Sequence, residues 1–474
     1  MHQNVHLPDG FLKHIASFIP KHLNIADFIA ACQRPLRKSI RVNTLKISVD
    51  DFQHRALTKG WGLTPIPWCT EGFWVEVDES QTPLGNTAEH LGGLFYIQEA
   101  SSMMPVSALF DQQDDTFECV LDMAAAPGSK TTQISAKMNN DGVLVANEFS
   151  ASRVKVLHAN TERCGVRNTA LTNFDGRVFG GWLPEQFDAV LIDAPCSGEG
   201  TVRKDASAMK NWSMASVLSI AATQKQLIES AFHALKPNGI MVYSTCTLSV
   251  EENQQVCLHL KETFGDNVEF EPLDGLFPDA HHAMTEQGFL HIFPQLFDCE
   301  GFFVAKIRKR GSVEAPEVKK RLGQFPFKKA TQIQQENIAL ELIKSLNITL
   351  PVDTSIWFRD NDVWLFPNAL EPMLGELRFS RMGIKIAEAH KKGYRWQHQV
   401  ATSLADGQQP YSVALSIDEA REWFMGRDVR PENLSGQGEV IVMLGNDVIG
   451  LGKWVGNRVK NGLPRELVRD KNLF

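Results

Sequence analysis

Two cysteines and one carboxylate are the residues of this chain best placed for covalent chemistry. Asp193 and Cys196 lie at the end of one apolar segment (187–195), and Cys246 follows another (239–245). A cysteine on its own is more often a small buried hydrophobe than a nucleophile. Two cysteines at the ends of separate apolar segments, one of them three residues from a carboxylate, favour the reactive alternative. A thiolate adds to an electron-poor carbon, and a nearby carboxyl group can hydrogen-bond or protonate the charge that the addition creates.

The sequence after Cys246 gives a further reason to expect a thiolate there. Ser249 and Glu252 have the spacing of a capping box, which predicts a helix that begins at Ser249 and continues through Leu260. The amides at a helix N-terminus stabilise a thiolate. Together with Asp193, this placement makes Cys246 a credible nucleophile.

A loop of small residues earlier in the chain predicts a cofactor site. Small residues let a ligand approach the backbone, and the helix expected after them presents free amides. The loop consists of Ala124, Ala125, Ala126, Pro127, Gly128, Ser129 and Lys130. Glu148 ends the next expected strand, where a carboxylate can accept both hydroxyls of a ribose. Asp175 ends the strand after that and is positioned to accept a hydrogen bond from an adenine amine.

Two other nucleotide-binding patterns fit this loop less well. A phosphate-binding loop needs glycine at position 123 and lysine directly after Gly128, whereas the chain has Met123 and Ser129. A dinucleotide site needs G-x-G-x-x-G, and the loop has a single glycine. The loop therefore fits an adenosine-type cofactor without a pyrophosphate.

The elements that must position these groups alternate between strands and helices from about residue 118 to residue 308. Short apolar segments rich in β-branched residues predict buried parallel strands, at 119–125, 142–148, 169–175, 187–195, 239–245 and 301–307. Helices are expected at 150–164, ending at Gly165, and at 219–235, ended by the Lys-Pro-Asn-Gly of 236–239. This alternation predicts a doubly wound α/β sheet, which binds ligands at the carboxyl ends of its strands.

The chain of 474 residues is too long for one ordinary domain. We expect an N-terminal extension, a catalytic domain, a linker, a small intermediate domain and a β-rich terminal domain, at 1–105, 106–310, 311–325, 326–395 and 396–474. In the last of these, two strands around 445–447 predict a hairpin.

The net charge of −8 is weak evidence against a nucleic-acid partner. The charge is uneven, however, because residues 311–474 carry a net of +2 and the first 310 residues carry −10. Short basic runs are the candidate contacts, although such a run is more often a solvated face than a phosphate site. They are Arg34, Arg37, Lys38 and Arg41; Lys385, Lys391, Lys392 and Arg395; and Arg458, Lys460, Arg465, Arg469 and Lys471.

Several classes of protein are disfavoured. No apolar stretch approaches eighteen residues, so no membrane span is expected, and the N-terminus does not resemble a signal peptide. The eight cysteines include no CxxC pair, which argues against a metal site and against a disulfide framework. We therefore expect a cytoplasmic protein with free thiols.

In their order along the chain, these motifs resemble the RNA cytosine-5 methyltransferases of the Nop/Sun family. The resemblance covers roughly residues 20–308 and rests on RVNTLK (41–46), YIQEASSM (96–103), AAAPGSKT (124–131), DAPCSGEG (193–200), YSTCT (243–247) and DCEGFFVAK (298–306). Residues 378–399 and 462–470 further resemble bacterial members of the family that methylate a cytosine in the decoding region of 16S rRNA.

The resemblance implies roles for the candidate residues. Cys246 would be the covalent nucleophile that adds to carbon 6 of cytosine, Cys196 would help release the product, and Asp193 would touch both base and cofactor. S-adenosyl-L-methionine would be the cofactor, bound by 124–130, Glu148, Asp175 and Asp193. The N-terminal extension and a PUA-like terminal domain would bind RNA, with 16S rRNA in the small ribosomal subunit as partner of a monomeric enzyme.

Three readings remain open at this point. The first is the 16S rRNA enzyme, and the second is an enzyme of the same class that acts on transfer RNA. The third is a non-catalytic RNA-binding assembly factor. The presence of both Cys246 and Asp193 argues against the third, because a scaffold needs neither.

Overall fold

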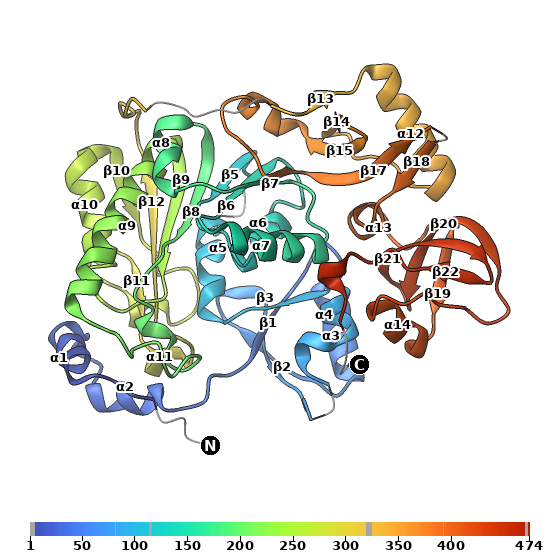
Figure 1. The fold of residues 1–474 in the computed structure, drawn as a ribbon. Coiled ribbons are helices and arrows are strands. Elements are labelled where there is room, and N and C mark those ends of the chain that lie inside the picture. Colours follow the sequence, from blue (N-terminus) through green and yellow to red (C-terminus); the bar gives the residue numbers. More distant parts are fainter. Residues whose placement is uncertain (1–4, 81, 113–115, 319–324, 392, 470–472) are drawn as a thin grey trace.

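The computed structural model describes residues 5–80, 82–112, 116–318, 325–391, 393–469 and 473–474. Four β-sheets organise the chain, and the largest forms the left half of the molecule in Figure 1. The expected linker at 311–325 includes residues 319–324, which lie outside the described residues. No helix in the described part of the chain combines the length and apolar character that a membrane span needs.

The largest sheet, here the catalytic sheet, confirms the expected doubly wound α/β fold. Its strand order is β10-β12-β9-β8-β5-β6-β7-β16, and β11 pairs with β12. The five parallel strands are β5 (Cys119–Asp122), β6 (Val143–Asn147), β7 (Thr169–Thr172), β8 (Phe187–Asp193) and β9 (Leu235–Thr245). Because side chains alternate along a strand, Leu121 joins the apolar core on one face of the sheet and Val120 joins the core on the other.

The last strand of the sheet departs from the sequence-based expectation. The segment predicted as a sixth parallel strand forms β12 (Phe302–Lys309), which runs antiparallel to β9. The chain reaches β12 through β10 (Val268–Glu271), β11 (Leu290–Ile292) and α11 (Pro294–Phe297). Since Phe303 pairs with Thr245, the chain enters β12 at the carboxyl edge of the sheet and must run back across it.

Helices cover both faces of the catalytic sheet (Figure 1). They are α5 (Met104–Leu109), α6 (Ser129–Lys137) and α7 (Ala151–Arg163) on one face, and α8 (Phe179–Trp182), α9 (Met214–Ala234) and α10 (Gln254–Phe264) on the other. The expected helix at 150–164 is confirmed as α7. The expected helix at 219–235 is confirmed as part of α9, which ends at Ala234 just before residues 236–239. These residues belong to β9, which begins at Leu235, and they form an irregularity in its pairing with β8.

The first hundred residues divide between two places. The N-terminal sheet contains β1 (Ser39–Val42), β2 (Gly62–Ile66), β3 (Cys69–Glu76) and β4 (Phe95–Ile97), with α3 (Val49–Thr58) and α4 (Ala88–Leu91) beside it. In contrast, α1 (Asp9–Phe18) and α2 (Ile25–Cys32) pack against Leu248 and Phe293 of the catalytic domain.

The C-terminal part of the chain forms two smaller sheets. The middle sheet contains β13 (Lys328–Lys329), β14 (Thr354–Arg359), β15 (Asp362–Pro367), β17 (Ile384–His390) and β18 (Gly393–Trp396), with α12 (Gln332–Leu346) and α13 (His398–Leu404). The C-terminal sheet contains β19 (Ser412–Leu415), β20 (Gly436–Leu444), β21 (Asp447–Gly456) and β22 (Arg458–Lys460), with α14 (Ile417–Phe424). The turn between β20 and β21 confirms the expected hairpin.

A two-residue strand joins the middle sheet to the catalytic sheet. This strand, β16 (Arg381–Met382), pairs antiparallel with β7. On either side of it, the amide of Ser380 donates to Leu171 O at 2.7 Å and the amide of Gly383 donates to Thr169 O at 2.8 Å. Met382 and three aromatic side chains of the middle sheet belong to the same apolar cluster as Phe179 and Trp182; these three are Trp357, Trp364 and Phe366. The two units are therefore joined by a shared core.

Replacement of Gly383 should loosen this junction. Gly383 has a φ of +54°, and a Cβ atom there would lie 1.9 Å from Leu365 O. Gly445 has a φ of +58° with open space around the same position, so Gly445→Ala introduces the backbone strain without the clash. We expect Gly383→Ala to lower the midpoint of thermal unfolding by at least about 3 °C more than Gly445→Ala. Equal midpoints in calorimetry would contradict the role given to this junction.

Candidate active site

The two cysteines predicted to do chemistry meet at the carboxyl edge of the catalytic sheet. The Sγ atoms of Cys196 and Cys246 lie 3.2 Å apart, and both side chains are half-buried. The amide of Gly200 donates to Cys246 O at 2.9 Å, which ties the loop after β8 to the loop after β9. Hydrogen bonding to Cys246 and burial raise the pKa of the Cys196 thiol well above its ordinary value. A protonated Cys196 can donate its thiol hydrogen toward the Cys246 sulfur.

The two loops are held together by two glutamates, each of which accepts hydrogen bonds from the other loop. Glu199, from the loop after β8, reaches into the loop after β9, where its Oε2 accepts from the amides of Leu248 (3.0 Å) and Ser249 (2.7 Å). Its two oxygens also accept from Thr247 Oγ1, Ser249 Oγ and Trp212 Nε1. The side chain is completely buried. Glu199 was not singled out from the sequence, because a glutamate two residues after a Ser-Gly pair shows no such role in its spacing.

Glu252 makes the return connection. Its Oε2 accepts from the amide of Ser197 at 2.9 Å and from Gln224 Nε2 at 3.0 Å. Burial raises the pKa of Glu252 to about 7. The predicted capping box at Ser249 and Glu252 is therefore wrong. Both side chains form hydrogen bonds with the loop after β8, and α10 begins only at Gln254. The polar contact at the Cys246 sulfur is the Cys196 thiol, not a helix N-terminus.

Asp193 lies beside this pair in a defined orientation. One carboxylate oxygen accepts from Lys130 Nζ at 2.7 Å, and the other accepts from Ser244 Oγ at 3.0 Å. Lys130 also donates to Ser102 Oγ at 2.9 Å. The lysine predicted for the cofactor loop thus points from α6 toward Asp193, a contact that the sequence did not indicate.

The small-residue loop lies between a strand and a helix, as expected. It connects β5 to α6, and Gly128 has a φ of +107° with no room for a side chain, since an added Cβ would lie 3.1 Å from Leu157. Asp122 stands beneath the loop and accepts from Thr131 Oγ1 at 2.7 Å, and burial raises its pKa to about 7. Ala125 and Ala126 are buried, whereas Pro127 is exposed.

Arg41 fixes the small-residue loop and the start of α6 through hydrogen bonds. Its guanidinium donates to Ser129 O and Gln98 Oε1, both at 2.7 Å, and to Thr132 Oγ1 at 2.8 Å. Arg41 is fully buried and is not part of a basic surface. Its neighbours in the first basic run are also occupied, since Arg37 pairs with Asp298 at 3.1 Å and Lys38 pairs with Glu79. The run is therefore structural. Lys392 and Lys471, from the two later runs, lie outside the described residues.

The remaining predicted cofactor residues line the same edge. Glu148 follows β6 and accepts from the amide of Ser150 at 2.8 Å and from Arg153 at 3.1 Å. Asp175 begins a short turn after β7, and its hydrogen bonds from Arg177 lower its pKa. Phe149, which the sequence did not single out, is 76% exposed directly beside Glu148.

The groups along this edge fit S-adenosylmethionine. Glu148 and Asp175 offer carboxylate oxygens at the positions where a ribose diol and an adenine amine are bound in such sheets. A carboxylate has about four lone pairs, so Glu148, with contacts to Ser150 and Arg153, keeps acceptors free. Arg177 donates to both oxygens of Asp175, so this carboxylate can accept from an adenine amine only if Arg177 gives up part of its contact. Phe149 offers an uncovered aromatic face beside Glu148. Among the described residues, the groups that could hold a metal lie away from this edge.

Known proteins match the chain along its whole length. Family models match in succession: the N-terminal domain of 16S rRNA methyltransferase RsmF (7–100), 16S rRNA methyltransferase RsmB/F (107–308), the pre-PUA domain of ribosomal RNA small subunit methyltransferase F (327–404) and the methyltransferase RsmF PUA domain (410–469). Ribosomal RNA small subunit methyltransferase F of Vibrio atlanticus is 73% identical over the full length of both chains, and that of Photobacterium profundum is 61% identical.

Solved structures agree with these matches. A methyltransferase homologue from Pyrococcus horikoshii is 34% identical, with a TM-score of 0.52, and the match covers 64% of this chain and all of that one. NSun6 from the same organism, at 22% identity and a TM-score of 0.55, shares the fold over 64% of this chain and 98% of its own. The predicted Nop/Sun resemblance is thereby confirmed. The chain belongs to the RsmB/F family of 16S rRNA methyltransferases, and within it to the group of ribosomal RNA small subunit methyltransferase F.

Proposed function

We propose that this chain transfers a methyl group from S-adenosylmethionine to carbon 5 of one cytosine in 16S rRNA, through a covalent bond between Cys246 and carbon 6. The observation that carries the proposal is the pair of sulfur atoms 3.2 Å apart, next to Asp193 and the cofactor loop. Carbon 5 of cytosine is a poor nucleophile until a thiolate adds at carbon 6. The intact pair favours an enzyme over a non-catalytic assembly factor, and the names of the full-length relatives favour rRNA over transfer RNA.

The cofactor would lie across the carboxyl ends of β5, β6 and β7. Glu148 would accept from the ribose hydroxyls, Asp175 would accept from the adenine amine, and Phe149 would stack on the adenine ring. The backbone from Ala124 to Lys130 would line the rest of the site. When bound, S-adenosylmethionine supplies an electrophilic methyl group on a sulfonium.

Asp193 and Lys130 would hold the base for the first step. The Cys246 thiolate forms a bond to carbon 6, the C5–C6 double bond opens, and negative charge moves toward N3. Asp193, fixed by Lys130 and Ser244, would hydrogen-bond at N3 or at the exocyclic amine. An enzyme cannot reach carbon 6 of a base that is stacked and paired within a duplex, so the target nucleotide would be flipped out or unpaired.

Cys196 would complete the cycle after methyl transfer. In the adduct the Cys246 sulfur is a neutral thioether, so the hydrogen bond that contributes most to the raised pKa of Cys196 is weakened, while burial still raises this pKa. Cys196 would then release its proton to solvent. Its thiolate then takes the proton from carbon 5, the C5–C6 double bond forms again and the bond to Cys246 breaks. Cys246 returns as a thiolate and Cys196 as a thiol, which is the starting arrangement.

The other domains would select the RNA. We propose RNA-binding roles for the N-terminal unit (1–105) and the PUA-like unit (396–474), with an intermediate domain at 326–395 between them. The substrate would be the decoding region of 16S rRNA in the small ribosomal subunit, and the enzyme would act as a cytoplasmic monomer. The match to a PUA-domain model supports the RNA-binding role of the last unit.

Cys246→Ala should abolish methyl transfer while cofactor binding survives. Loss of the nucleophile removes the covalent route, so we expect at least about a thousand-fold lower turnover of tritiated cofactor on 16S rRNA. Cofactor affinity in calorimetry should be unchanged. Cys257→Ala, at a cysteine buried in the core, is the matched control and should keep its turnover. Undiminished turnover in the Cys246 variant would refute the mechanism.

Cys196→Ala should trap the enzyme on its product. Addition and methyl transfer need only Cys246, but release needs the group that removes the carbon 5 proton. We expect a protein–RNA adduct that survives denaturing gels and carries the labelled methyl group. The double variant Cys196→Ala/Cys246→Ala should form none. Normal turnover without an adduct would show that another group serves as the base.

Glu199→Gln should misplace the nucleophile without touching the cofactor site. The carboxylate accepts five hydrogen bonds, and an amide nitrogen would face at least one of the same donors. We expect a 10- to 100-fold lower kcat, an unchanged cofactor Kd and no change in the pH at which activity is half-maximal. Glu251→Gln is the control, because Glu251 lies in the loop after β9 that Glu199 contacts, and its own partner is His14. A wild-type kcat in the Glu199 variant would refute its positioning role.

A further inference from the structure

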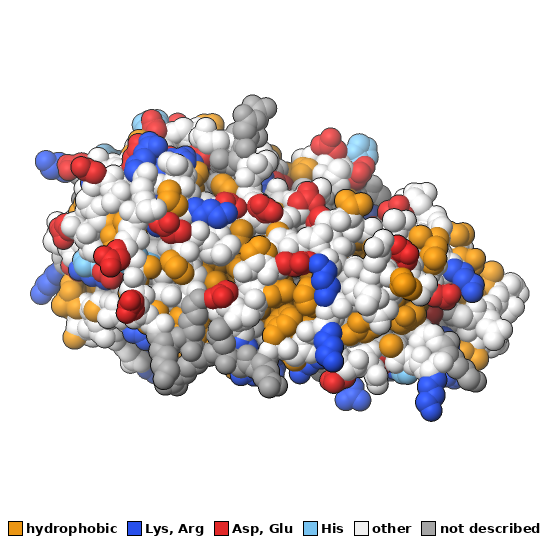
Figure 2. Space-filling view, turned by 90° about the horizontal axis from the view of Figure 1, so that it is seen from above, with side chains coloured by type: hydrophobic (Ala, Val, Ile, Leu, Met, Phe, Trp, Pro, Cys, Tyr) orange, Lys and Arg blue, Asp and Glu red, His pale blue; other side chains and the backbone are white. Residues whose placement is uncertain are grey.

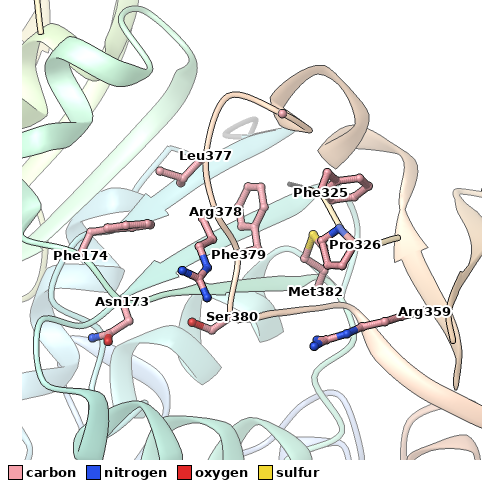
Figure 3. A pocket seen from close by; sticks show the side chains of 11 residues that line it. Asn173, Phe174, Phe325, Pro326, Arg359, Leu377, Arg378, Phe379, Ser380 and Met382 are labelled. Carbon is pink, nitrogen blue, oxygen red and sulfur yellow. The ribbon is translucent and has the colours of Figure 1, made fainter. Parts of the chain in front are cut away.

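A pocket of about 730 Å³ lies where the catalytic domain meets the middle sheet. Asn173 and Phe174 line it from the loop after β7, and Phe325, Arg359, Arg378 and Phe379 line it from the middle-sheet side (Figure 3). Its volume is within the range of small-ligand sites, about 300–1,000 Å³. The described residues that line it include neither the two active-site cysteines nor Glu148 and Asp193, so it is distinct from the active site.

Three phenylalanine rings stand around this pocket. Figure 3 shows Phe174 projecting from the catalytic domain, with Phe325 and Phe379 on the opposite side. Edge contacts fix two of the rings: Phe174 packs on Trp182 with ring centroids 5.1 Å apart, and Phe325 packs on Trp357 at 5.9 Å. All three rings remain half-exposed. Fixed and partly uncovered rings are suited to stacking on a flat ligand.

Two guanidinium groups give the pocket its charge. Arg359 and Arg378 approach from opposite sides, and both lie toward Ser380 (Figure 3). Both side chains are exposed, and within the described ranges neither forms an ion pair or a hydrogen bond. Nearby cations are occupied, since Lys385 pairs with Asp362 and Glu388, both at 2.8 Å, and Arg381 contacts His158. Two unpaired guanidinium groups in a chain of net charge −8 indicate an anionic ligand.

The pocket continues into further hollows. A second, of about 490 Å³, shares Arg359 and Ser380 with the first, and a third, of about 340 Å³, shares Gln397, His398 and Gly462 with the second. Lys453 and Lys460 of the C-terminal sheet line the third hollow. We call this connected series the trough. It runs from the loop beside Asp175 to the C-terminal domain, so it suits a polymer better than a small molecule.

Cations without a partner lie toward the two ends of the trough. The middle hollow contains Glu162, Asp362 and Glu466, which disfavour a phosphate there, and its cations Lys385 and Arg381 already have partners. The surface seen in Figure 2 carries acidic, basic and hydrophobic side chains side by side, and the coloured atoms form no continuous basic patch. Anchoring of an RNA strand therefore depends on the few unpaired cations.

We propose that the first pocket binds one unpaired nucleotide of the rRNA other than the target cytosine. Its phosphate would lie between Arg359 and Arg378, and its base would stack on Phe379 against Phe174. This inference rests on the proposed function, because it takes RNA as the substrate. Arginine forms paired hydrogen bonds to phosphate, and stacking on aromatic rings is tolerant of base identity. The pocket would thus secure the strand that leads from the C-terminal domain to the cofactor edge.

Binding of in vitro transcribed 16S rRNA by the full-length protein tests the proposal. In the double variant Arg359→Gln/Arg378→Gln we expect a 10- to 100-fold weaker Kd, with the slope of log K against log salt smaller by about 0.7 for each lost contact. Phe379→Ala should weaken binding and leave the slope unchanged. The matched control Arg308→Gln/Arg310→Gln removes two paired cations, which contact Glu271 and Glu269, and should bind normally.

Cofactor affinity separates the two possible sources of the nucleotide. We expect an unchanged Kd for S-adenosylmethionine in all variants and a kcat within about two-fold of wild type at saturating RNA. A loss of cofactor affinity with normal RNA binding would assign the pocket to the cofactor and overturn the proposal. Unaltered RNA affinity and salt slope in the arginine variant would overturn it as well. Failure of the wild-type chain itself to bind or methylate 16S rRNA would refute the proposed function instead.

Discussion

Two glutamates, Glu199 and Glu252, link the loops that follow β8 and β9, and the arrangement of the candidate active site depends on them. Each glutamate lies in one loop and accepts hydrogen bonds from the other. A buried carboxylate is unfavourable unless it is hydrogen-bonded, and each loop supplies donors that the other loop's glutamate requires. Neither loop can therefore keep its shape without the other. Their joint shape brings two sulfur atoms to 3.2 Å, which no property of the separate strands would achieve. The placement of the two cysteines follows from this pairing.

Two buried arginines connect that arrangement to the N-terminal residues. Arg203, in the segment after β8, donates to Pro35 O at 2.7 Å, Arg34 O at 3.1 Å and Cys299 O at 3.2 Å. Arg41 makes the corresponding connection to the cofactor loop. Each guanidinium satisfies several backbone carbonyls at once, so the N-terminal unit is part of the frame that fixes both halves of the site.

The sequence predicted those features that depend on local pattern. The parallel strands and the small-residue loop were found because burial and close ligand approach restrict residue types over several consecutive positions. The capping box failed since the same Ser and Glu spacing serves long-range partners here. Arg41 was grouped with a basic surface because its burial is set by residues 57 or more positions away. Likewise, β16 is two residues long, too short to have a period, although it joins two domains.

The distribution of cations reconciles an acidic chain with an RNA substrate. Near the N-terminus, cations pair with acids or backbone carbonyls, so they stabilise the fold and leave little field for a phosphate. In the trough, Arg359 and Arg378 remain unpaired beside aromatic rings. Acidic side chains elsewhere repel RNA, and attraction is strongest where these few groups are free. An acidic surface with a few free cations therefore favours one path for the strand over diffuse binding. Along the proposed path, the strand would pass from the C-terminal domain to the loop that carries Asp175, so that substrate and cofactor would meet at the same edge of one sheet.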